Sequence, residues 1–457
     1  MRTAKVPHPM LSRRPIVTCL PLVMLIAGCS LDRILEVELP GVVTEEALDD
    51  PKLAVVITNS AIGGFECAWN QYTALASYHS DEWIPSSTTG HFVASEWGRR
   101  GTSASSISTS YTCTTFGGIF IPLQTARAQG DDVYRRLGTL TVANRAKLQA
   151  IARAYGGYAL VGLAESYCSM ALDGGPRLTP LQVMAEAESR FGEALTIVQQ
   201  AGDTIGVQGM ARVGRARARL YRGDFAGAIA DAQAVAAGYL RAASRGDEEP
   251  RRRNYSYEYL TGETGGPLMY GSVAETFRGL TVNALGAHTR NAADTPDPRL
   301  VIATTGRNGQ DSRTPHFFHQ KYPARSTPVP IASYKEAQLI IAEAAARSGD
   351  LTTARAAING RHAAAGLPPW DLAGAATQAE IIRHVLDERA RELFNEGGWR
   401  LSDMLRFRAT PYQIPFRGEP GSIHPNGVDQ TGLAYGTTTC IPLPAAEEQG
   451  NPNLSGS

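Results

Sequence analysis

A repeated pair of helical segments is the feature that most constrains how this chain can fold. In ARVGRARARLYRGDFAGAIADAQAVA, Gly223-Asp224 separates two segments whose small and apolar residues recur at a helical period. The same plan returns in YKEAQLIIAEAAARSGDLTTARAAING, where Gly349-Asp350 takes the same place. Glycine ends one helix and aspartate caps the next, while small residues let the two helices approach closely. The pattern predicts tetratricopeptide-like helical hairpins.

Further periodic segments extend this plan along the chain. Helical hairpins are expected over about residues 145–240 and 333–407. Loop-rich excursions are expected over about 67–125 and 245–332, where Ser, Thr, Gly, Pro, Asn and aromatic residues replace the helical period. The predicted fold is therefore mainly α, a tetratricopeptide-like helical-repeat scaffold with long irregular loop excursions.

The N-terminus has the layout of a lipoprotein signal peptide. Four basic residues precede an apolar stretch at 16–27, which is too short to span a bilayer. Ile26-Ala27-Gly28-Cys29 has the order of a bacterial lipobox, although an ordinary signal followed by a chance cysteine is the alternative. Residues 1–28 are expected to be removed, leaving residues 29–457 as one domain that is anchored through acyl chains on Cys29.

Charge and cysteine content agree with an exported chain. Removing residues 1–28 takes four basic and no acidic residues from 44 of each, so the net charge becomes −4, and no nucleic-acid partner is expected. The four remaining cysteines allow two disulfides with three connectivities, and their spacings fit no zinc motif. Our hypothesis pairs Cys67 with Cys113 and Cys168 with Cys440, because each bridge would fasten irregular chain to the scaffold.

An ordered series of motifs resembles the SusD/RagB family of outer-membrane nutrient-binding lipoproteins. The series comprises the lipobox followed by Leu31-Asp32, AESYCSMALDGGPRLTP, RRRNYSYE, DPRL, KYP, YKEAQLIIAEAAARSGD, ERARELFNEGGWRLSDMLRF and IPLPAAEEQGNPNL. It covers essentially the whole chain after the signal peptide. One departure is an extra residue before Arg400, where the family usually reads Glu-Gly-x-Arg, and it leaves the geometry of that turn open.

The resemblance implies a SusD-like fold and a non-catalytic surface lipoprotein of the outer membrane. Members of the family are expected to bind an extracellular nutrient, often an oligosaccharide, and to deliver it to a SusC-like TonB-dependent transporter. The alternative from another class is an envelope assembly scaffold lipoprotein, since tetratricopeptide-like repeats also organise protein complexes. A scaffold, unlike a receptor, has little use for aromatic-rich excursions.

No catalytic, cofactor or metal site is predicted. The charged residues between Glu388 and Arg406 recur at spacings of three and four, which favours a structural ion-pair network over a catalytic cluster. His316 and His319 in HFFH could begin a metal site, but no third ligand lies nearby in the sequence, so ordinary histidines are favoured. TGETGGP lacks the features of a phosphate loop or a dinucleotide fingerprint.

Aromatic residues of the two excursions are the candidate ligand contacts. Aromatic faces pack against the apolar C–H faces of sugars while neighbouring polar groups bond the hydroxyls. Each ring taken singly is more often a core residue, but binding residues concentrate on loops that a rigid scaffold holds. The candidates are Trp69, Tyr78, Trp83, His91, Phe92, Trp97, Arg99 and Tyr257.

Overall fold

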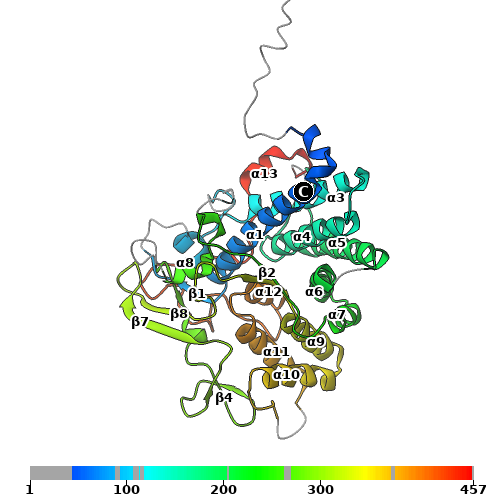
Figure 1. The fold of residues 1–457 in the computed structure, drawn as a ribbon. Coiled ribbons are helices and arrows are strands. Elements are labelled where there is room, and N and C mark those ends of the chain that lie inside the picture. The colour runs from blue at the N-terminus through cyan, green and yellow to red at the C-terminus, as the bar shows by residue number, and fades with distance from the viewer. Residues whose placement is uncertain are drawn as a thin grey trace, which may run out of the picture. The chain divides into compact units, whose positions relative to one another are not determined.

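The computed structural model describes residues 44–87, 93–106, 113, 118–202, 205–261, 269–371 and 376–454. Residues Leu48–Ser457 form one compact unit, and helices make up most of its regular structure (Figure 1). The predicted mainly α fold is confirmed. No helix within the described ranges is long and apolar enough to cross a membrane. The predicted signal peptide and Cys29 lie outside the described residues.

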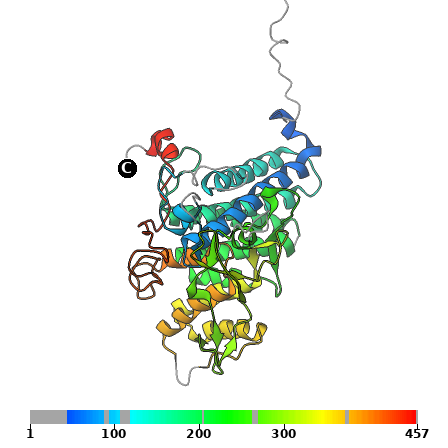
Figure 2. The ribbon, with the colours of Figure 1, turned by 90° about the vertical axis from the view of Figure 1, so that its left-hand side faces the viewer.

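Four long helices pack against one another in the first half of this unit. They are α1 (Ala54–His79), α3 (Phe120–Thr139), α4 (Arg145–Ala164) and α5 (Pro180–Gln200), seen together in Figure 2. Helices α3 and α4 cross closely at Gly130, where a Cβ atom would lie 2.8 Å from the carbonyl oxygen of Ala152. A side chain at this position would therefore push the two helices apart.

The two Gly-Asp junctions form the hairpins that the sequence predicts. The first joins α6 (Ile205–Arg222) to α7 (Phe225–Gln233), and the second joins α9 (Tyr334–Ser348) to α10 (Leu351–Ala364). Both glycines have positive φ, and each aspartate accepts a hydrogen bond from a backbone N–H three residues later. Helices α11 (Gln378–Glu392) and α12 (Trp399–Arg406) follow.

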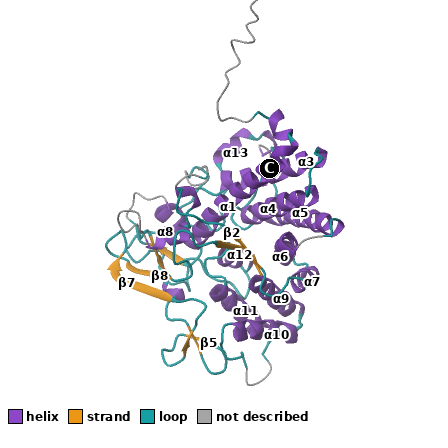
Figure 3. Ribbon diagram, in the orientation of Figure 1, coloured by secondary structure: helices purple, strands orange, loops and turns teal. Residues whose placement is uncertain are grey.

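Most of the short strands come from the second predicted excursion, and β7 and β8 lie on the opposite side of the unit from α6 and α7 (Figure 3). Antiparallel pairs join β1 (Trp83–Pro85) to β3 (Gly271–Val273), β2 (Leu240–Ala243) to β9 (Val329–Ser333), and β7 (Ile302–Asn308) to β8 (Pro315–His319). The central strand β4 (Thr281–Val282) pairs with β5 (His288–Thr289) and β6 (Thr295–Pro296). The short helix α8 (Tyr255–Thr261) packs beside β3 and β8, whereas α13 (Ala445–Gly450) lies near α3 (Figure 1).

The first predicted excursion, residues 67–125, is wrong at both ends. Helix α1 continues to His79, and α3 already begins at Phe120. Every residue from Phe65 to His79 is buried, so this half of α1 has no solvent-exposed face. A helix that is buried on all sides lacks the amphipathic period by which helices are recognised in sequences.

The structure contains the two disulfides of the hypothesis. Cys67 on α1 is bonded to Cys113, and Cys168, just after α4, is bonded to Cys440. Beside the second bridge, the N–H of Cys168 donates to the carbonyl of Ile441 at 2.9 Å. The bridge therefore joins the scaffold to the C-terminal part of the chain, as the hypothesis required.

The charged segment from Glu388 to Arg406 forms the predicted ion-pair network. The Arg389 guanidinium, 1% exposed, lies 2.6 Å from Glu343 and 2.8 Å from Asp403, and both carboxylates also contact Arg406. The extra residue in the following turn is accommodated by Gly397 and Gly398, whose φ values are 58° and 70°. Such positive φ values suit glycine, and α12 begins directly afterwards.

Candidate ligand-binding cavity

Four of the predicted aromatic contacts lie in the hydrophobic core. Trp69, Tyr78, Trp83 and Trp97 each have 0% of their surface exposed. The indole N–H of Trp69, for example, donates to the carbonyl of Pro330 at 2.8 Å, while its ring packs among α1 and α4. No surface of these four rings is therefore available to a ligand in this structure. They are core residues, which is the more common role of a single aromatic ring.

The other predicted ligand contacts differ in where they lie. Arg99 is buried and forms a 2.6 Å ion pair with Asp429, so its charge is used inside the protein. His91 and Phe92 lie outside the described residues. Tyr257, on α8, lines a cavity.

This cavity, of about 470 Å³, lies between α8, the β7–β8 hairpin and the segment after β8. The walls carry aromatic rings beside groups that form hydrogen bonds. Phe318 is partly exposed, Gln320 is exposed, and Tyr257 is 9% exposed. The lining residues are Tyr257, Thr261, Thr305, His316, Phe318, His319, Gln320, Tyr322 and Pro323.

Hydrogen bonds fix the orientation of His316 in the wall. Its Nε2 donates to the carbonyl of Leu260, so Nδ1 accepts from the hydroxyl of Thr305 at 3.2 Å. Burial lowers the pKa of His316, which keeps the ring neutral at physiological pH. The ring of Phe318 stacks with His316 at 5.9 Å, since alternate residues of β8 share one face.

The predicted aromatics support this cavity from behind. Trp83 stacks on His319 at 6.3 Å, and Tyr78 meets Trp83 edge-on at 5.1 Å. Buried Arg417 donates to the backbone carbonyls of both Tyr78 and Trp83. These contacts fix the wall because a packed ring layer leaves few alternative rotamers. The aromatic cluster thus positions the cavity rather than lining it.

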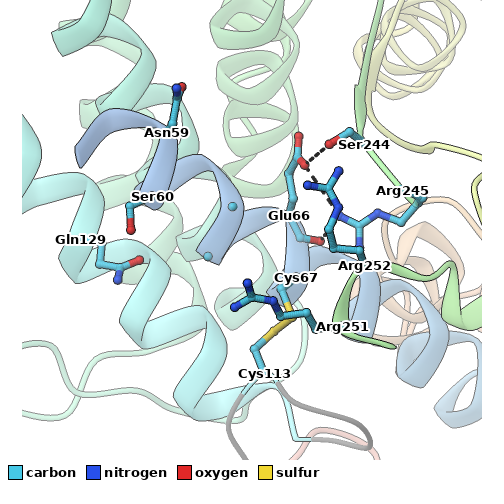
Figure 4. A pocket seen from close by; sticks show the side chains of 12 residues that line it. Asn59, Ser60, Glu66, Cys67, Cys113, Gln129, Ser244, Arg245, Arg251 and Arg252 are labelled. Atoms are coloured by element: carbon cyan, nitrogen blue, oxygen red, sulfur yellow. Dashed lines mark hydrogen bonds and ion pairs between the residues drawn. A yellow bond between two sulfur atoms is a disulfide. The ribbon is translucent and has the colours of Figure 1, made fainter. Parts of the chain in front are cut away.

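A second cavity, of about 400 Å³, is polar and lies beside α1 (Figure 4). Glu66 accepts a 2.6 Å hydrogen bond from Ser244, and its backbone carbonyl accepts one from Arg245 at 2.9 Å. Burial lowers the pKa of Arg245 to about 10. Figure 4 shows Arg251 beside the Cys67–Cys113 disulfide. Among the described residues, the lining of this cavity includes arginine side chains and no aromatic ring. It therefore suits an anion better than a neutral sugar.

The histidines of HFFH do not form a shared metal site. His316 and His319 are three residues apart in β8. Side chains alternate between the two faces of a strand, so an odd spacing places these two on opposite faces. A different group, His288, His362, His384 and Glu388, brings four ligand-type atoms within 4.8 Å of one another. No sequence pattern predicted this group, because its members come from three separate segments. The four-residue spacing of His384 and Glu388 on one helix was the available signal.

Comparison with known proteins agrees with this architecture. The SusD family model matches residues 320–455, and no curated protein sequence matches the chain. A SusD-like carbohydrate binding protein from Bacteroides vulgatus ATCC 8482 superposes with a TM-score of 0.65 at 17% identity, covering 88% of this chain and 97% of that one.

Two further solved structures have the same fold. A SusD-like protein from Bacteroides fragilis NCTC 9343 has a TM-score of 0.65 at 15% identity, over 91% of this chain and 97% of that one. A SusD superfamily protein from Bacteroides thetaiotaomicron VPI-5482 has a TM-score of 0.61 at 15% identity, over 89% and 98% of the two chains. Residues 320–455 thus match the SusD family model, and the chain shares the fold of these SusD-like proteins.

Proposed function

We propose that this protein binds an extracellular oligosaccharide in the cavity between α8 and the β7–β8 hairpin and delivers it unchanged to a SusC-like TonB-dependent transporter. The observation that carries the proposal is the composition of that cavity, in which aromatic rings stand beside hydroxyl, amide and imidazole groups. Acyl chains on Cys29 would hold the protein at the outer membrane, facing the cell surface.

The chemistry of the cavity suits a neutral, hydroxyl-rich ligand. Its volume of about 470 Å³ is within the range of small-molecule sites, about 300–1,000 Å³. The partly exposed ring of Phe318 offers a flat apolar surface, against which the C–H face of a sugar ring can pack. Thr261, Thr305 and Gln320 supply groups that can bond sugar hydroxyls.

Binding without cleavage is part of the proposal. Glycoside hydrolysis generally uses two carboxylates that flank the scissile bond. The described residues that line this cavity contribute hydroxyls, an amide, imidazoles and aromatic rings, and no carboxylate. The match of residues 320–455 to the SusD family model, and the carbohydrate-binding description of the Bacteroides vulgatus neighbour, support the binding part of this proposal.

The test is a saccharide screen followed by calorimetry on matched variants. Phe318→Ala should weaken binding of a saccharide ligand by about 1–3 kcal/mol, which is roughly a 5–150-fold increase in Kd. Phe225→Ala is the matched control, because Phe225 is a partly exposed ring in the helical repeat on α7. It should leave Kd unchanged.

A third variant, Arg251→Ala, distinguishes the two cavities. Loss of saccharide binding in this variant alone would move the site to the polar cavity beside α1. If no saccharide binds the intact protein while another small molecule does, the oligosaccharide assignment fails and nutrient binding remains. If no small ligand binds and the protein still assembles with envelope partners, the scaffold alternative is correct.

The lipid anchor on Cys29 and the binding to a transporter are each tested by a separate measurement. Mass spectrometry of the membrane-extracted protein should find an acylated Cys29 as its first residue, and an unmodified N-terminus elsewhere would contradict the anchor. Purification from detergent-solubilised membranes should recover a TonB-dependent barrel, and its absence would count against delivery to a transporter.

A further inference from the structure

Three histidines and one glutamate meet at a buried point, and none of the four lines the proposed ligand cavity. His288 comes from β5, His362 from α10, and both His384 and Glu388 from α11. Oε2 of Glu388 lies 2.8 Å from Nε2 of His288, 3.1 Å from Nε2 of His362 and 4.0 Å from Nε2 of His384. The carboxylate oxygen is therefore the common neighbour of three imidazoles.

The Nε2 atoms of two histidines at this point lack a matched hydrogen-bond partner. Nδ1 of His362 lies 2.6 Å from the carbonyl oxygen of Pro368, so it must donate, and Nε2 of the neutral ring is an acceptor. That acceptor faces the carboxylate of Glu388, also an acceptor, at 3.1 Å. Nε2 of His384 has no hydrogen-bond partner among the described residues, although its side chain is only 9% exposed. Buried acceptors that face one another require a cation or a proton between them.

The separations suit a small tetrahedral cation. Zinc binds imidazole nitrogen and carboxylate oxygen at about 2.0–2.2 Å, which places neighbouring tetrahedral ligands about 3.3–3.5 Å apart. The three distances from the Glu388 oxygen scatter around that value. All four ligand atoms lie within 4.8 Å of one another, so movements of a few tenths of an ångström to about one ångström would complete the shell.

Outer contacts orient these ligands as in known metal sites. The Asp387 carboxylate lies 2.6 Å from Nδ1 of His288, and Arg299 contacts the second oxygen of Glu388. Trp370 stacks on His384 with a centroid distance of 3.8 Å and an angle of 4° between the rings. Partners that fix the outer face of each ligand keep its lone pair directed at the metal.

We propose that His288, His362, His384 and Glu388 form a structural site for a divalent transition metal, with Zn²⁺ as the ion that this ligand set favours. Four protein ligands in a buried position are typical of closed, structural sites rather than catalytic ones. The ion would tie the β4–β5–β6 sheet to α10 and α11. A cavity of about 350 Å³ lined by His288, Asp387 and Arg391 provides a route of entry.

The experiment measures metal binding by the purified full chain. After dialysis in metal-free buffer, the protein should retain or rebind one Zn²⁺ per chain, and Co²⁺ should give the strong visible absorption of a tetrahedral site. His384→Phe keeps an aromatic ring against Trp370 but removes the ligand. Loss of a group that only orients a metal ligand costs about 10–100-fold in metal affinity. Loss of the ligand itself should weaken Zn²⁺ binding by at least that factor.

His424→Phe is the matched control, because His424 also stacks on an aromatic ring, that of Tyr435, outside this cluster. It should bind Zn²⁺ as the unaltered chain does. Failure of the unaltered chain to bind Zn²⁺ or Co²⁺ would overturn the proposal and leave a protonated His288 as the cation beside Glu388. An octahedral Co²⁺ spectrum, or equal affinity in His384→Phe, would also overturn it. The Co²⁺ spectrum of the unaltered chain decides the question if His384→Phe does not fold.

Discussion

Replacing Arg217 by methionine should destabilise the fold strongly without touching the proposed ligand cavity. Arg217 on α6 is 1% exposed and serves two buried carboxylates. Its Nε and Nη2 donate to Glu165 at 2.8 and 2.5 Å, and Nη1 lies 3.3 Å from Glu336. Nη2 also donates to the carbonyl of Gly397 at 2.6 Å. One side chain therefore joins α6 to the end of α4, to α9 and to the turn before α12.

The magnitude follows from what the substitution leaves behind. Without the guanidinium, Glu165 keeps a 2.7 Å hydrogen bond from Tyr72 but no neighbouring cation on that side. Removing one partner of a buried ion pair costs about 3–5 kcal/mol, because the remaining charge stays buried and uncompensated. Methionine fills a similar volume beside Trp399, so a cavity contributes little. We expect a loss of about 3–5 kcal/mol in the free energy of unfolding.

Urea unfolding followed by circular dichroism measures this loss. Arg222→Met is the control, because Arg222 is 40% exposed and its pair with Glu188 should contribute about 1 kcal/mol or less. The loss in Arg217→Met should be larger at pH 8 than at pH 5, since protonation of a carboxyl group relieves the uncompensated charge. Adding Glu165→Gln should recover part of the loss. A loss below about 1 kcal/mol with an unchanged m-value would refute the buried-charge reasoning.

Three further outcomes are expected. Burial lowers the pKa of His79 to about 4, so the unfolded chain binds a proton between about pH 6.5 and pH 4 that the folded chain does not. Relative to His79→Gln, the unaltered chain should lose about 3 kcal/mol as the pH falls across that window, and parallel pH profiles in urea would contradict this. Replacing Cys168 and Cys440 by serine should cost about 2–5 kcal/mol, measured by urea unfolding; an unchanged midpoint would show that the bridge does not constrain the chain. Gly398→Ala should cost more than about 1 kcal/mol, since Gly398 has φ +70° and a Cβ atom would lie 2.1 Å from the Tyr72 hydroxyl; an unchanged Tm would contradict that strain.

Local signals predicted the repeats and one part of the charge network, the i, i+3 pair of Asp403 and Arg406. Arg389 reaches Glu343 and Asp403 across separate elements. Gly223-Asp224 and Gly349-Asp350 end and begin helices through their own backbone and side-chain preferences, which act over a few residues. The i, i+3 and i, i+4 charge spacings likewise reflect helix geometry. The disulfide pairing required only that each bridge fasten irregular chain to the scaffold.

Burial and long-range contacts could not be predicted in the same way. Helix α1 is buried on all sides in its second half, so its sequence lacks the alternation of buried and exposed faces that marks a surface helix. The same rings that suggested sugar contacts, such as Trp83, are covered by segments more than one hundred residues away in the chain, through partners such as His319. The cluster at Glu388 depends on three segments whose meeting is set by tertiary packing. Exposure is a property of the whole fold, and residue type alone does not determine it.

The most direct test of the proposed function is a crystal structure of the protein with a saccharide selected by the binding screen. We predict a sugar ring packed on Phe318 within the cavity lined by Tyr257, Thr305 and His316. Its hydroxyls should lie within hydrogen-bond distance of the polar wall. A saccharide bound at the Arg245 and Arg251 cavity instead, or a cavity at Phe318 that stays empty at saturating saccharide, would contradict the account.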